Sequence, residues 1–212
     1  MYRLFGATGT GSAVIEMALE RCNVPYSLVQ ACSWEPGVGR EALKRVNPLM
    51  QVPTLVLPDG SVITESVAIL IHLGLGFPAS GLLPQGDALK AQALRGLVYI
   101  ATNCYVPIGI IDYPERWLSE RDERSMQCLR EGARSQLYKN WDTFSDQFSG
   151  KAVWCRDDPG ALEMLAAVVS RWAQAREYLR LSRPGFHASL ECIDLHPQVR
   201  SVIERHWPID PS

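Results

Sequence analysis

The sequence lacks the paired cysteines that would point to a disulfide scaffold or a metal site. Its six cysteines are scattered, and no two of them form a CxxC pair or the spacing of a zinc site. Reduced thiols are therefore the simpler interpretation, and no metal is predicted. The four histidines show no ligand spacing either, so we interpret them as structural or surface residues. The cysteines are Cys22, Cys32, Cys104, Cys128, Cys155 and Cys192, and the histidines are His72, His187, His196 and His206.

An excess of charge of either sign is also missing. The formal net charge is −2 and the pI is about 6.1, whereas nucleic-acid binders usually carry a basic stripe that neutralises phosphates. The chain does not open with a basic segment and a long apolar run, and no stretch reaches the ~18 apolar residues that span a bilayer. We therefore expect no nucleic acid and no membrane as partner, and a cytoplasmic location.

The sequence does contain an ordinary globular composition, with 47% hydrophobic and 21% charged residues in a chain of 212. This length allows one large domain or two of roughly 100 residues each. The first part alternates short apolar runs with helical patterns. Residues 2–5 are predicted to form a strand, residues 13–22 a helix and residues 25–30 a second strand. This order indicates a right-handed βαβ unit with parallel strands.

A helix, a hairpin and a second helix follow. The first of these helices ends at Asn47 because the residue before a proline avoids the α region, and Asp59-Gly60 favours a tight turn between antiparallel strands. The last helix is apolar on most sides and is predicted to be buried. The order βαβ, helix, ββα predicts a thioredoxin-like α/β domain with a four-stranded mixed sheet over residues 1–76. The helices are predicted over residues 41–46 and 65–75, and the strands over residues 54–57 and 61–63.

The second half of the chain gives no convincing strand pairs. Residues 74–86 contain four glycines and two prolines, a composition typical of a connection, and we predict a linker over residues 77–87. Residues 88–212 are predicted to form an all-α helical domain. Its helices are expected over residues 88–113, 120–148, 162–181, 186–193 and 199–207.

The most specific pattern lies around the predicted hairpin. Residues 47–54 read Asn-Pro-Leu-Met-Gln-Val-Pro-Thr, and Thr64-Glu65-Ser66 follows the hairpin. Together with the preceding βαβ pattern, this stretch resembles the glutathione S-transferase superfamily, in particular its bacterial-type cytosolic members. The resemblance implies that Pro53 follows a cis peptide bond. The backbone of Val52 would then pair with the cysteinyl residue of glutathione like an added strand.

The same resemblance implies how the γ-glutamyl group of glutathione is held. Ser66 would bind its carboxylate at the amino end of a helix, where unpaired N–H groups and the helix dipole attract anions. Glu65 would face the α-amino group, and Gln51 would contact the peptide or its carboxylate. The alternative is that Glu65 and Ser66 merely begin a stable helix. Their combination with Gln51, Val52 and Pro53 favours the binding site.

Catalysis in this family needs a group that lowers the pKa of the glutathione thiol, and the resemblance places that group in the loop after the first strand. This loop offers three hydroxyls, Thr8, Thr10 and Ser12, and no tyrosine or cysteine. Alignment on the first helix makes Thr8 the first choice, with Thr10 or Ser12 the second. The alignment also puts Gly11 where the cysteine-dependent bacterial class carries its cysteine. Alternatively, these residues only form a turn and cap the helix.

Two positions depart from the family pattern. The usual Ser/Thr-x-x-Asp capping box of the helical domain corresponds to Gly160 and Glu163. Because glycine has no side-chain acceptor, only half of the reciprocal cap is expected. Met50 stands where a glycine is frequent before Gln-Val-Pro, which could alter the mouth of the site.

An electrophile pocket is expected between the two domains, where small-molecule sites often form. Tyr105, Tyr113 and Trp117 are the candidates to line it, although single aromatics on long helices also belong to cores. Three basic residues near the short helix could meet the glycyl carboxylate of glutathione or simply be solvated. They are Arg40, Lys44 and Arg45.

These implications predict a glutathione transferase that activates glutathione as a thiolate for attack on a small electrophile, as in detoxification. Glutathione is the co-substrate and no further cofactor is expected, and the resemblance implies a homodimer. One alternative is a protein of this fold that binds glutathione or a partner without turnover. The other is a glutathione-dependent isomerase or disulfide reductase, and the reductase is disfavoured because no cysteine occupies the first loop.

Overall fold

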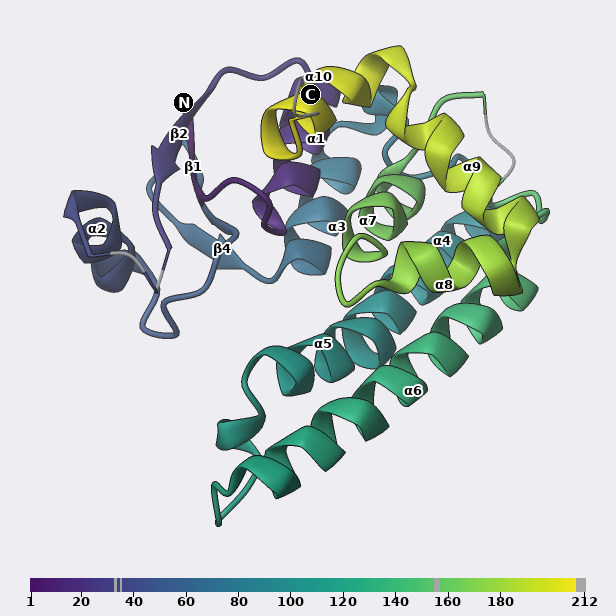
Figure 1. The fold of residues 1–212 in the computed structure, drawn as a ribbon. Helices are drawn as coiled ribbons and strands as arrows, with labels where there is room; N and C mark the ends of the chain where they lie inside the picture. Colours follow the sequence, from purple (N-terminus) through teal and green to yellow (C-terminus); the bar gives the residue numbers. More distant parts are fainter. Residues whose placement is uncertain (33, 35, 155–156, 209–212) are drawn as a thin grey trace.

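The computed structural model describes residues 1–32, 34, 36–154 and 157–208. Cys155 and the last four residues of the predicted helical domain lie outside these described residues. Within them the chain forms a small α/β domain followed by a larger helical one (Figure 1).

The N-terminal domain has the predicted thioredoxin-like order, which confirms this part of the fold. Its four strands are arranged β2-β1-β3-β4, with β1 parallel to β2 and antiparallel to β3. Leu4 at the centre of the sheet lies opposite Leu28 on one side and Leu55 on the other. The elements are β1 (Tyr2–Gly6), α1 (Ser12–Arg21), β2 (Tyr26–Gln30), α2 (Val38–Val46), β3 (Thr54–Val56), β4 (Val62–Thr64) and α3 (Ser66–Gly76).

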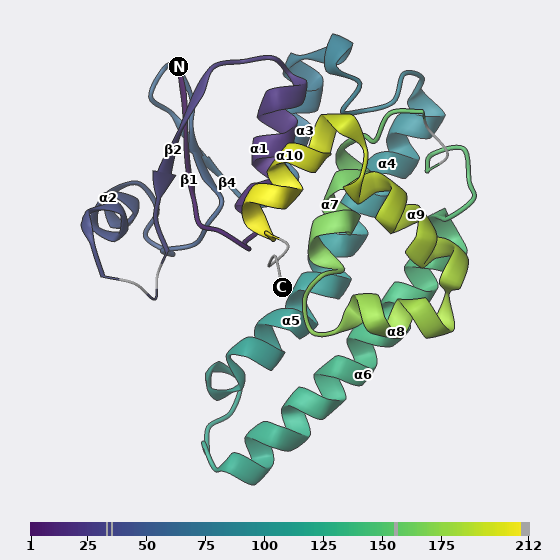
Figure 2. The same cartoon turned by 45° about the horizontal axis from the view of Figure 1, so that its top comes forward.

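Helices cover both faces of this sheet. Helices α1 and α3 lie between the sheet and the helical domain, whereas α2 lies on the opposite face (Figures 1 and 2). Under α2 there is only a small apolar cluster of Phe5, Ala31, Leu43 and Val56. The other face is much more deeply buried, because every residue of α1 from Ser12 to Leu19 is buried. The first loop and the amino end of α1 are thereby fixed beside the helical domain.

The second domain consists of helices throughout the described residues, as predicted. The long helix α6 runs beside α4 and α5, and α7 lies at the centre with all nine of its residues buried (Figure 1). The elements are η1 (Pro78–Ser80), α4 (Asp87–Tyr99), the π-helical segment η2 (Ile100–Cys104), α5 (Tyr105–Asp112), η3 (Pro114–Arg116), α6 (Glu123–Phe148), α7 (Ala161–Val169), α8 (Ala175–Ser182), α9 (Pro184–Asp194) and α10 (Pro197–His206).

Two predicted helices differ from the structure. The prediction of one helix over residues 162–181 is wrong, because the chain breaks between α7 and α8, where Ala173 and Gln174 adopt left-handed φ angles of 52° and 63°. The helix predicted over residues 88–113 is not a regular α-helix throughout, because it widens into the π-helical segment η2 between α4 and α5. Pro107 has no N–H for the carbonyl of Asn103 one turn earlier, and that carbonyl instead accepts from Nδ2 of Asn140 at 2.6 Å.

The two domains share one hydrophobic core. Residues of the sheet, α1 and α3, among them Leu4 and Leu55, belong to the same buried cluster as residues of α4, α7 and α10.

The half cap predicted at the start of α7 is present, since the backbone N–H of Gly160 donates to Oε2 of Glu163 at 3.1 Å. The stretch Asp87–Asp112 is long and apolar enough to span a membrane by length and composition, and 33% of its most apolar window is buried in the single chain.

Candidate functional site

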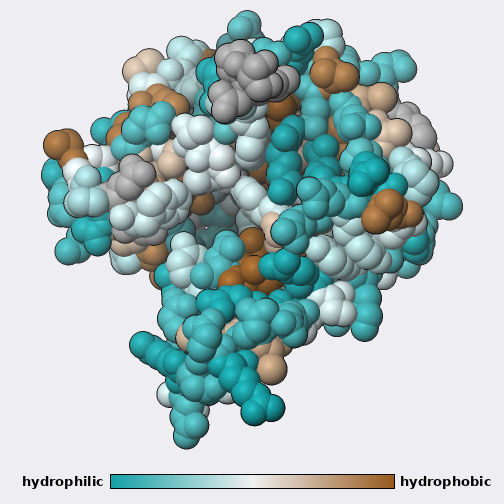
Figure 3. All heavy atoms as spheres, viewed as in Figure 1, coloured by the Kyte–Doolittle hydropathy of each residue, from teal (hydrophilic) through white to brown (hydrophobic). Residues whose placement is uncertain are grey.

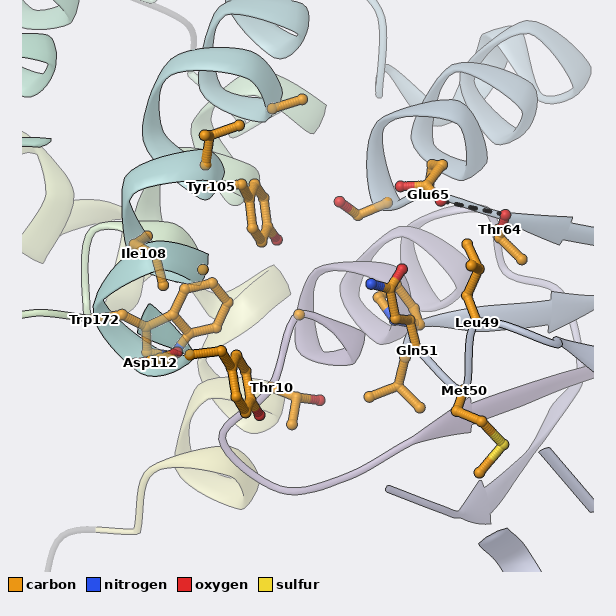
Figure 4. Close-up of a pocket in the computed structure, with 18 of the residues that line it drawn as sticks. Thr10, Leu49, Met50, Gln51, Thr64, Glu65, Tyr105, Ile108, Asp112 and Trp172 are labelled. Carbon is orange, nitrogen blue, oxygen red and sulfur yellow. Dashed lines mark hydrogen bonds between the residues drawn. The ribbon is translucent and has the colours of Figure 1, made fainter. Parts of the chain in front are cut away.

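A cavity of about 1030 Å³ opens between the two domains. It is visible as a hollow in the space-filling view (Figure 3). One wall comes from the loop after β1, the loop before β3 and the start of α3, and the other from η2, α5, η3 and Trp172 (Figure 4). Several segments that are distant in sequence therefore meet around one space, in the place where the electrophile pocket was expected.

The five residues that the sequence predicted for glutathione all line this cavity: Gln51, Val52, Pro53, Glu65 and Ser66. The peptide bond between Val52 and Pro53 is cis, as the resemblance implied. Gln51 and Glu65 are exposed and come from two different loops, and Ser66 is half-buried. Figure 4 shows Gln51 and Glu65 on the same wall, across the cavity from Tyr105.

A buried asparagine holds the loop before β3, which the sequence reasoning missed. Nδ2 of Asn47 donates to the carbonyl oxygen of Gln51 at 3.0 Å and to Oγ1 of Thr54 at 2.9 Å. Its Oδ1 accepts from the N–H of Leu49 at 3.0 Å, and Oγ1 of Thr54 donates to the carbonyl of Gln51 at 2.8 Å. The signal was present in the sequence, because an asparagine and a threonine bracket the motif and both side chains favour such local bonds.

The backbone at the start of α3 is strained. Glu65 precedes the helix with φ 64° and ψ 110°, a combination that few residues other than glycine adopt and that costs about 1–3 kcal/mol. Residues 64–67 line the cavity, so the first turn of α3 faces it with N–H groups that have no partner inside the helix. Such a terminus attracts anions. Helix α3 is 11 residues long.

The three hydroxyls of the first loop lie in different environments. Thr8, the first choice from the sequence, is exposed and lines a separate hollow of about 300 Å³ beside α10. The loop turns at Ala7, whose carbonyl accepts from the N–H of Thr10 at 3.3 Å, and this turn directs Thr8 away from the large cavity. Ser12 does not line the cavity either, since it is fully buried in the first turn of α1.

Thr10 is the hydroxyl residue of this loop that lines the large cavity. Its Oγ1 donates to the carbonyl of Ala7 at 2.7 Å and accepts from the N–H of Ser12 at 3.3 Å. Oγ of Ser12 lies 3.0 Å from Oγ1 of Thr10 and 3.2 Å from the same carbonyl. Ser12 can therefore take over the bond to Ala7, which leaves the Thr10 proton available to a ligand. The helix N-cap is Gly11, not a hydroxyl residue.

Two residues of the helical domain form hydrogen bonds with the backbone of Gly9, which lies between Thr8 and Thr10. The N–H of Gly9 donates to Nδ1 of His206 at 3.2 Å, and Nε1–H of Trp172 donates to the carbonyl of Gly9 at 3.2 Å. Nε2 of His206 lies 2.6 Å from Oε1 of the buried Glu16. Both residues come from distant parts of the sequence, so no local pattern could reveal them. His206 is 6% exposed.

The aromatic candidates on the helical side all line the cavity. Tyr113 lies under the guanidinium of Arg116, which is 3.8 Å from the ring centroid, and Trp117 is 57% exposed at the rim. The Tyr105 hydroxyl is enclosed without a hydrogen-bond partner among the described residues. Burial raises its pKa to about 12, although the nearby Ser66 side chain partly offsets the rise. The phenol therefore stays protonated at neutral pH.

The lining of the cavity differs from the sequence prediction at several further residues. Arg40, Lys44 and Arg45 do not line it, because they lie on or beside α2 on the far face of the sheet. The exposed Trp34 lines it instead and was missed. Burial raises the pKa of the Asp112 carboxyl on the helical wall. Among the described residues no group of three or more histidine, cysteine or acidic side chains is arranged to hold a metal ion.

The sheet order, the all-helical second domain and the interdomain cavity beside a cis-proline turn define a glutathione transferase architecture. Residues 12–74 match the family described as glutathione S-transferase, N-terminal domain. These residues place the first domain of the chain in the glutathione S-transferase superfamily, and bacterial GST-like proteins are similar over nearly the whole chain.

Individual relatives are similar at modest identity. The chain is 27% identical to an uncharacterized GST-like protein, YncG, of Escherichia coli K12 over 97% of this chain and 98% of that protein. A probable maleylacetoacetate isomerase of Caenorhabditis elegans is 39% identical over 94 residues, which are 44% of this chain and 42% of the isomerase. The crystal structure of a glutathione transferase homologue from Sulfitobacter, with bound glutathione, has a TM-score of 0.81 at 22% identity and covers 95% of this chain and 96% of its own.

Proposed function

We propose that this protein binds glutathione in the interdomain cavity and transfers it, as the thiolate, to a small electrophile. The observation that carries the proposal is the meeting of the Val52–Pro53 turn, the amino end of α3 and the first loop around one cavity. Glutathione has a peptide backbone, a carboxylate beside an amine, and a thiol. The Val52–Pro53 turn matches the peptide backbone, the amino end of α3 matches the carboxylate and amine, and the first loop matches the thiol.

In the proposed complex the backbone of Val52 pairs with the cysteinyl residue of glutathione, as an added strand would. The γ-glutamyl carboxylate lies at the amino end of α3 with Ser66, and Glu65 faces the α-amino group. Gln51 contacts the peptide from the exposed end of its loop. The exposed Trp34 also lines the cavity, and in the proposed complex its ring covers the glycyl residue.

Thr10 is the proposed donor to the sulfur, in place of Thr8. A free thiol has a pKa of about 8.5, and each unit by which the pKa falls corresponds to about 1.4 kcal/mol of preferential thiolate stabilisation. The hydroxyl of Thr10 and the amino end of α1 both favour the anion. The thiol proton leaves to solvent, and the electrophile lies against Tyr113 and Trp117. The thiolate sulfur then forms a bond to the electrophilic carbon as the leaving group departs, which is chloride for a chloronitroaromatic.

The test is direct. Purified protein is titrated with glutathione by calorimetry, and conjugation of a chloronitroaromatic is followed by absorbance. We expect binding, thiolate absorbance at neutral pH and turnover. Binding without thiolate or turnover would instead support a non-catalytic glutathione-binding protein, and absence of binding would defeat the proposal.

A second candidate is glutathione-dependent isomerisation of a double bond. The similarity to a probable maleylacetoacetate isomerase favours it, and the guanidinium of Arg116 in the cavity could pair with a substrate carboxylate. Turnover of maleylacetoacetate that requires catalytic glutathione would support this function. A disulfide reductase is disfavoured, because no cysteine lines the described cavity and burial raises the pKa of the neighbouring Cys104 thiol.

The proposal includes a cytoplasmic homodimer that acts in detoxification. In the single chain 33% of the most apolar window of Asp87–Asp112 is buried, and Leu89 and Val98 of α4 are 37% and 49% exposed. Leu75 at the end of α3 is 58% exposed. Covering such residues against a second copy would remove apolar surface from water.

A further inference from the structure

Gly9 is the only residue between Thr8 and Thr10, and both polar groups of its backbone are bonded to the helical domain. Its N–H donates to His206, the last residue of α10, and its carbonyl accepts from Trp172, which follows α7. Gly9 has a φ of +73°, a conformation that glycine adopts without strain. The orientation of this residue is therefore set from outside its own domain.

The protonation pattern of His206 follows from its partners. Because Nδ1 accepts the N–H of Gly9 at 3.2 Å, the ring proton must be on Nε2, which donates to Oε1 of Glu16 at 2.6 Å. Glu16 lies on α1, directly below the loop, and is 2% exposed. The carboxylate therefore fixes both the tautomer and the orientation of the imidazole, as in other carboxylate–histidine pairs.

Thr10 is the residue that this arrangement places. It follows Gly9 directly, lines the large cavity and exchanges hydrogen bonds with Ala7 and Ser12. A hydroxyl stabilises a thiolate only if its proton is aimed at the sulfur within hydrogen-bonding distance. A shift of the Gly9 peptide would move this hydroxyl relative to the cavity while leaving Val52, Glu65 and Ser66 in place.

We propose that His206 and Trp172 are positioning residues, which set the Thr10 hydroxyl for activation of the glutathione thiol by holding the Gly9 peptide from the helical domain. The proposal rests on the proposed glutathione function. It assigns a role in thiol activation to α10 and to the turn between α7 and α8, neither of which belongs to the predicted glutathione wall.

Two substitutions separate the two bonds of His206. In His206→Gln the amide nitrogen takes the place of Nε2 and keeps the bond to Glu16, but no acceptor remains for Gly9. In His206→Asn the amide oxygen takes the place of Nδ1 and keeps the bond to Gly9, but the side chain is too short for Glu16. His196→Gln is the matched control, because His196 also accepts a backbone N–H with Nδ1, from Gln198, and faces a carboxylate, Asp158.

For each variant the apparent pKa of the bound glutathione thiol is measured by thiolate absorbance, alongside kcat/KM, the affinity for S-methylglutathione and the urea midpoint. We expect His206→Gln to raise the thiol pKa by about one unit and lower kcat/KM at neutral pH about tenfold, with unchanged affinity for S-methylglutathione. His206→Asn should lower the urea midpoint yet keep the thiol pKa of the wild type. Trp172→Phe, which loses the bond to the Gly9 carbonyl, should also raise the thiol pKa.

A purely structural role for His206 predicts a different pattern, in which the thiol pKa follows stability. A raised pKa in both His206 variants, or in neither, or only in His206→Asn, would overturn the inference. Wild-type protein that fails to bind glutathione would overturn the proposed function and this inference together. Normal binding and turnover with an unaffected His206→Gln variant would overturn the inference alone.

Discussion

At the scale of single residues, Tyr105 places a buried hydroxyl at the cavity without a hydrogen-bond partner among the described residues. Less than 1 Å² of the Tyr105 hydroxyl oxygen is accessible, and it makes no hydrogen bond to a described residue. A Cβ atom on Gly11 would lie only 3.0 Å from it, and Trp172 packs beside its ring with the centroids 5.7 Å apart. Gly11 is thus the position where the backbone must come close to this phenol, which explains why no side chain stands there.

Tyr105→Phe should therefore stabilise the free protein. The substitution removes a buried hydroxyl that has no hydrogen-bond partner among the described residues, a situation that costs about 1–3 kcal/mol. We expect the free energy of unfolding in urea to rise by about 1 kcal/mol. Tyr99→Phe is the matched comparison, since the Tyr99 hydroxyl donates to the carbonyl of Asn140 at 3.0 Å and its loss should destabilise. A similar loss in both variants would mean that Tyr105 has a partner after all.

Ser66→Ala tests the anion site at the start of α3. Loss of a hydrogen bond to a charged group costs about 1.5–3 kcal/mol, so we expect the Kd for glutathione to rise at least tenfold in calorimetry. The thiol pKa of the residual complex should be unchanged, because the γ-glutamyl carboxylate and not the sulfur is affected. Ser61→Ala in the exposed turn before β4, where the hydroxyl bonds only Asp59, should bind as the wild type does. Equal affinities of the two variants would remove Ser66 from the site.

At the scale of elements, two irregular segments shape the site. The loop from α2 to β3 is held by Asn47 and Thr54, and Met50 within it has a φ of 57°. On the opposite wall the π-helical segment η2 precedes Tyr105, and Asn140 of α6 supplies the hydrogen bond that Pro107 cannot. Widened π turns recur at functional sites in helices. Each wall thus departs from regular structure where it meets the cavity, with an asparagine side chain bonded to a backbone carbonyl, buried Asn47 on one wall and half-buried Asn140 on the other.

Asn47→Ala tests the first of these segments. The substitution removes the donor to Oγ1 of the buried Thr54 and to the carbonyl of Gln51, and the acceptor for the N–H of Leu49, so we expect a loss of about 2 kcal/mol in the free energy of unfolding. The affinity for glutathione should also fall, because Gln51 and Val52 belong to the released loop. Gln127→Ala, which alters an exposed bond on α6, is the control for urea denaturation and calorimetry. A stable Asn47→Ala variant with full affinity would show that the loop does not depend on this residue.

At the scale of the whole molecule, the domains are joined both by a continuous core and by polar contacts to the loop after β1. The buried cluster runs from the sheet through α1 to α7, and Glu16, His206 and Trp172 connect the same parts through hydrogen bonds. Leu89 and Val98 of α4 remain exposed in the single chain. The shared core and the polar contacts hold the two walls of the cavity in place. The exposed apolar residues favour assembly with a second copy of the chain.

Val98→Glu should convert a dimer into monomers. A charge placed on the exposed apolar side of α4 would be buried without a partner in the assembled protein, which is strongly unfavourable. Sedimentation velocity should show a dimer for the wild type and a monomer for the variant, with unchanged circular dichroism. Leu181→Glu is the control, because Leu181 is 76% exposed on α8 and lies away from that surface. A monomeric wild type would contradict the proposed homodimer.

The sequence by itself determined the order of elements, because local apolar periodicity and turn residues such as Asp59-Gly60 and Asn47-Pro48 act within a few residues. It also indicated the glutathione wall, since Gln51, Val52, Pro53, Glu65 and Ser66 form two short motifs. Only the tertiary structure decided which first-loop hydroxyl faces the cavity, why the chain breaks after α7, and that His206 and Trp172 reach Gly9. The contacts to Gly9 join residues more than 150 positions apart, and such contacts leave no periodic trace in the chain.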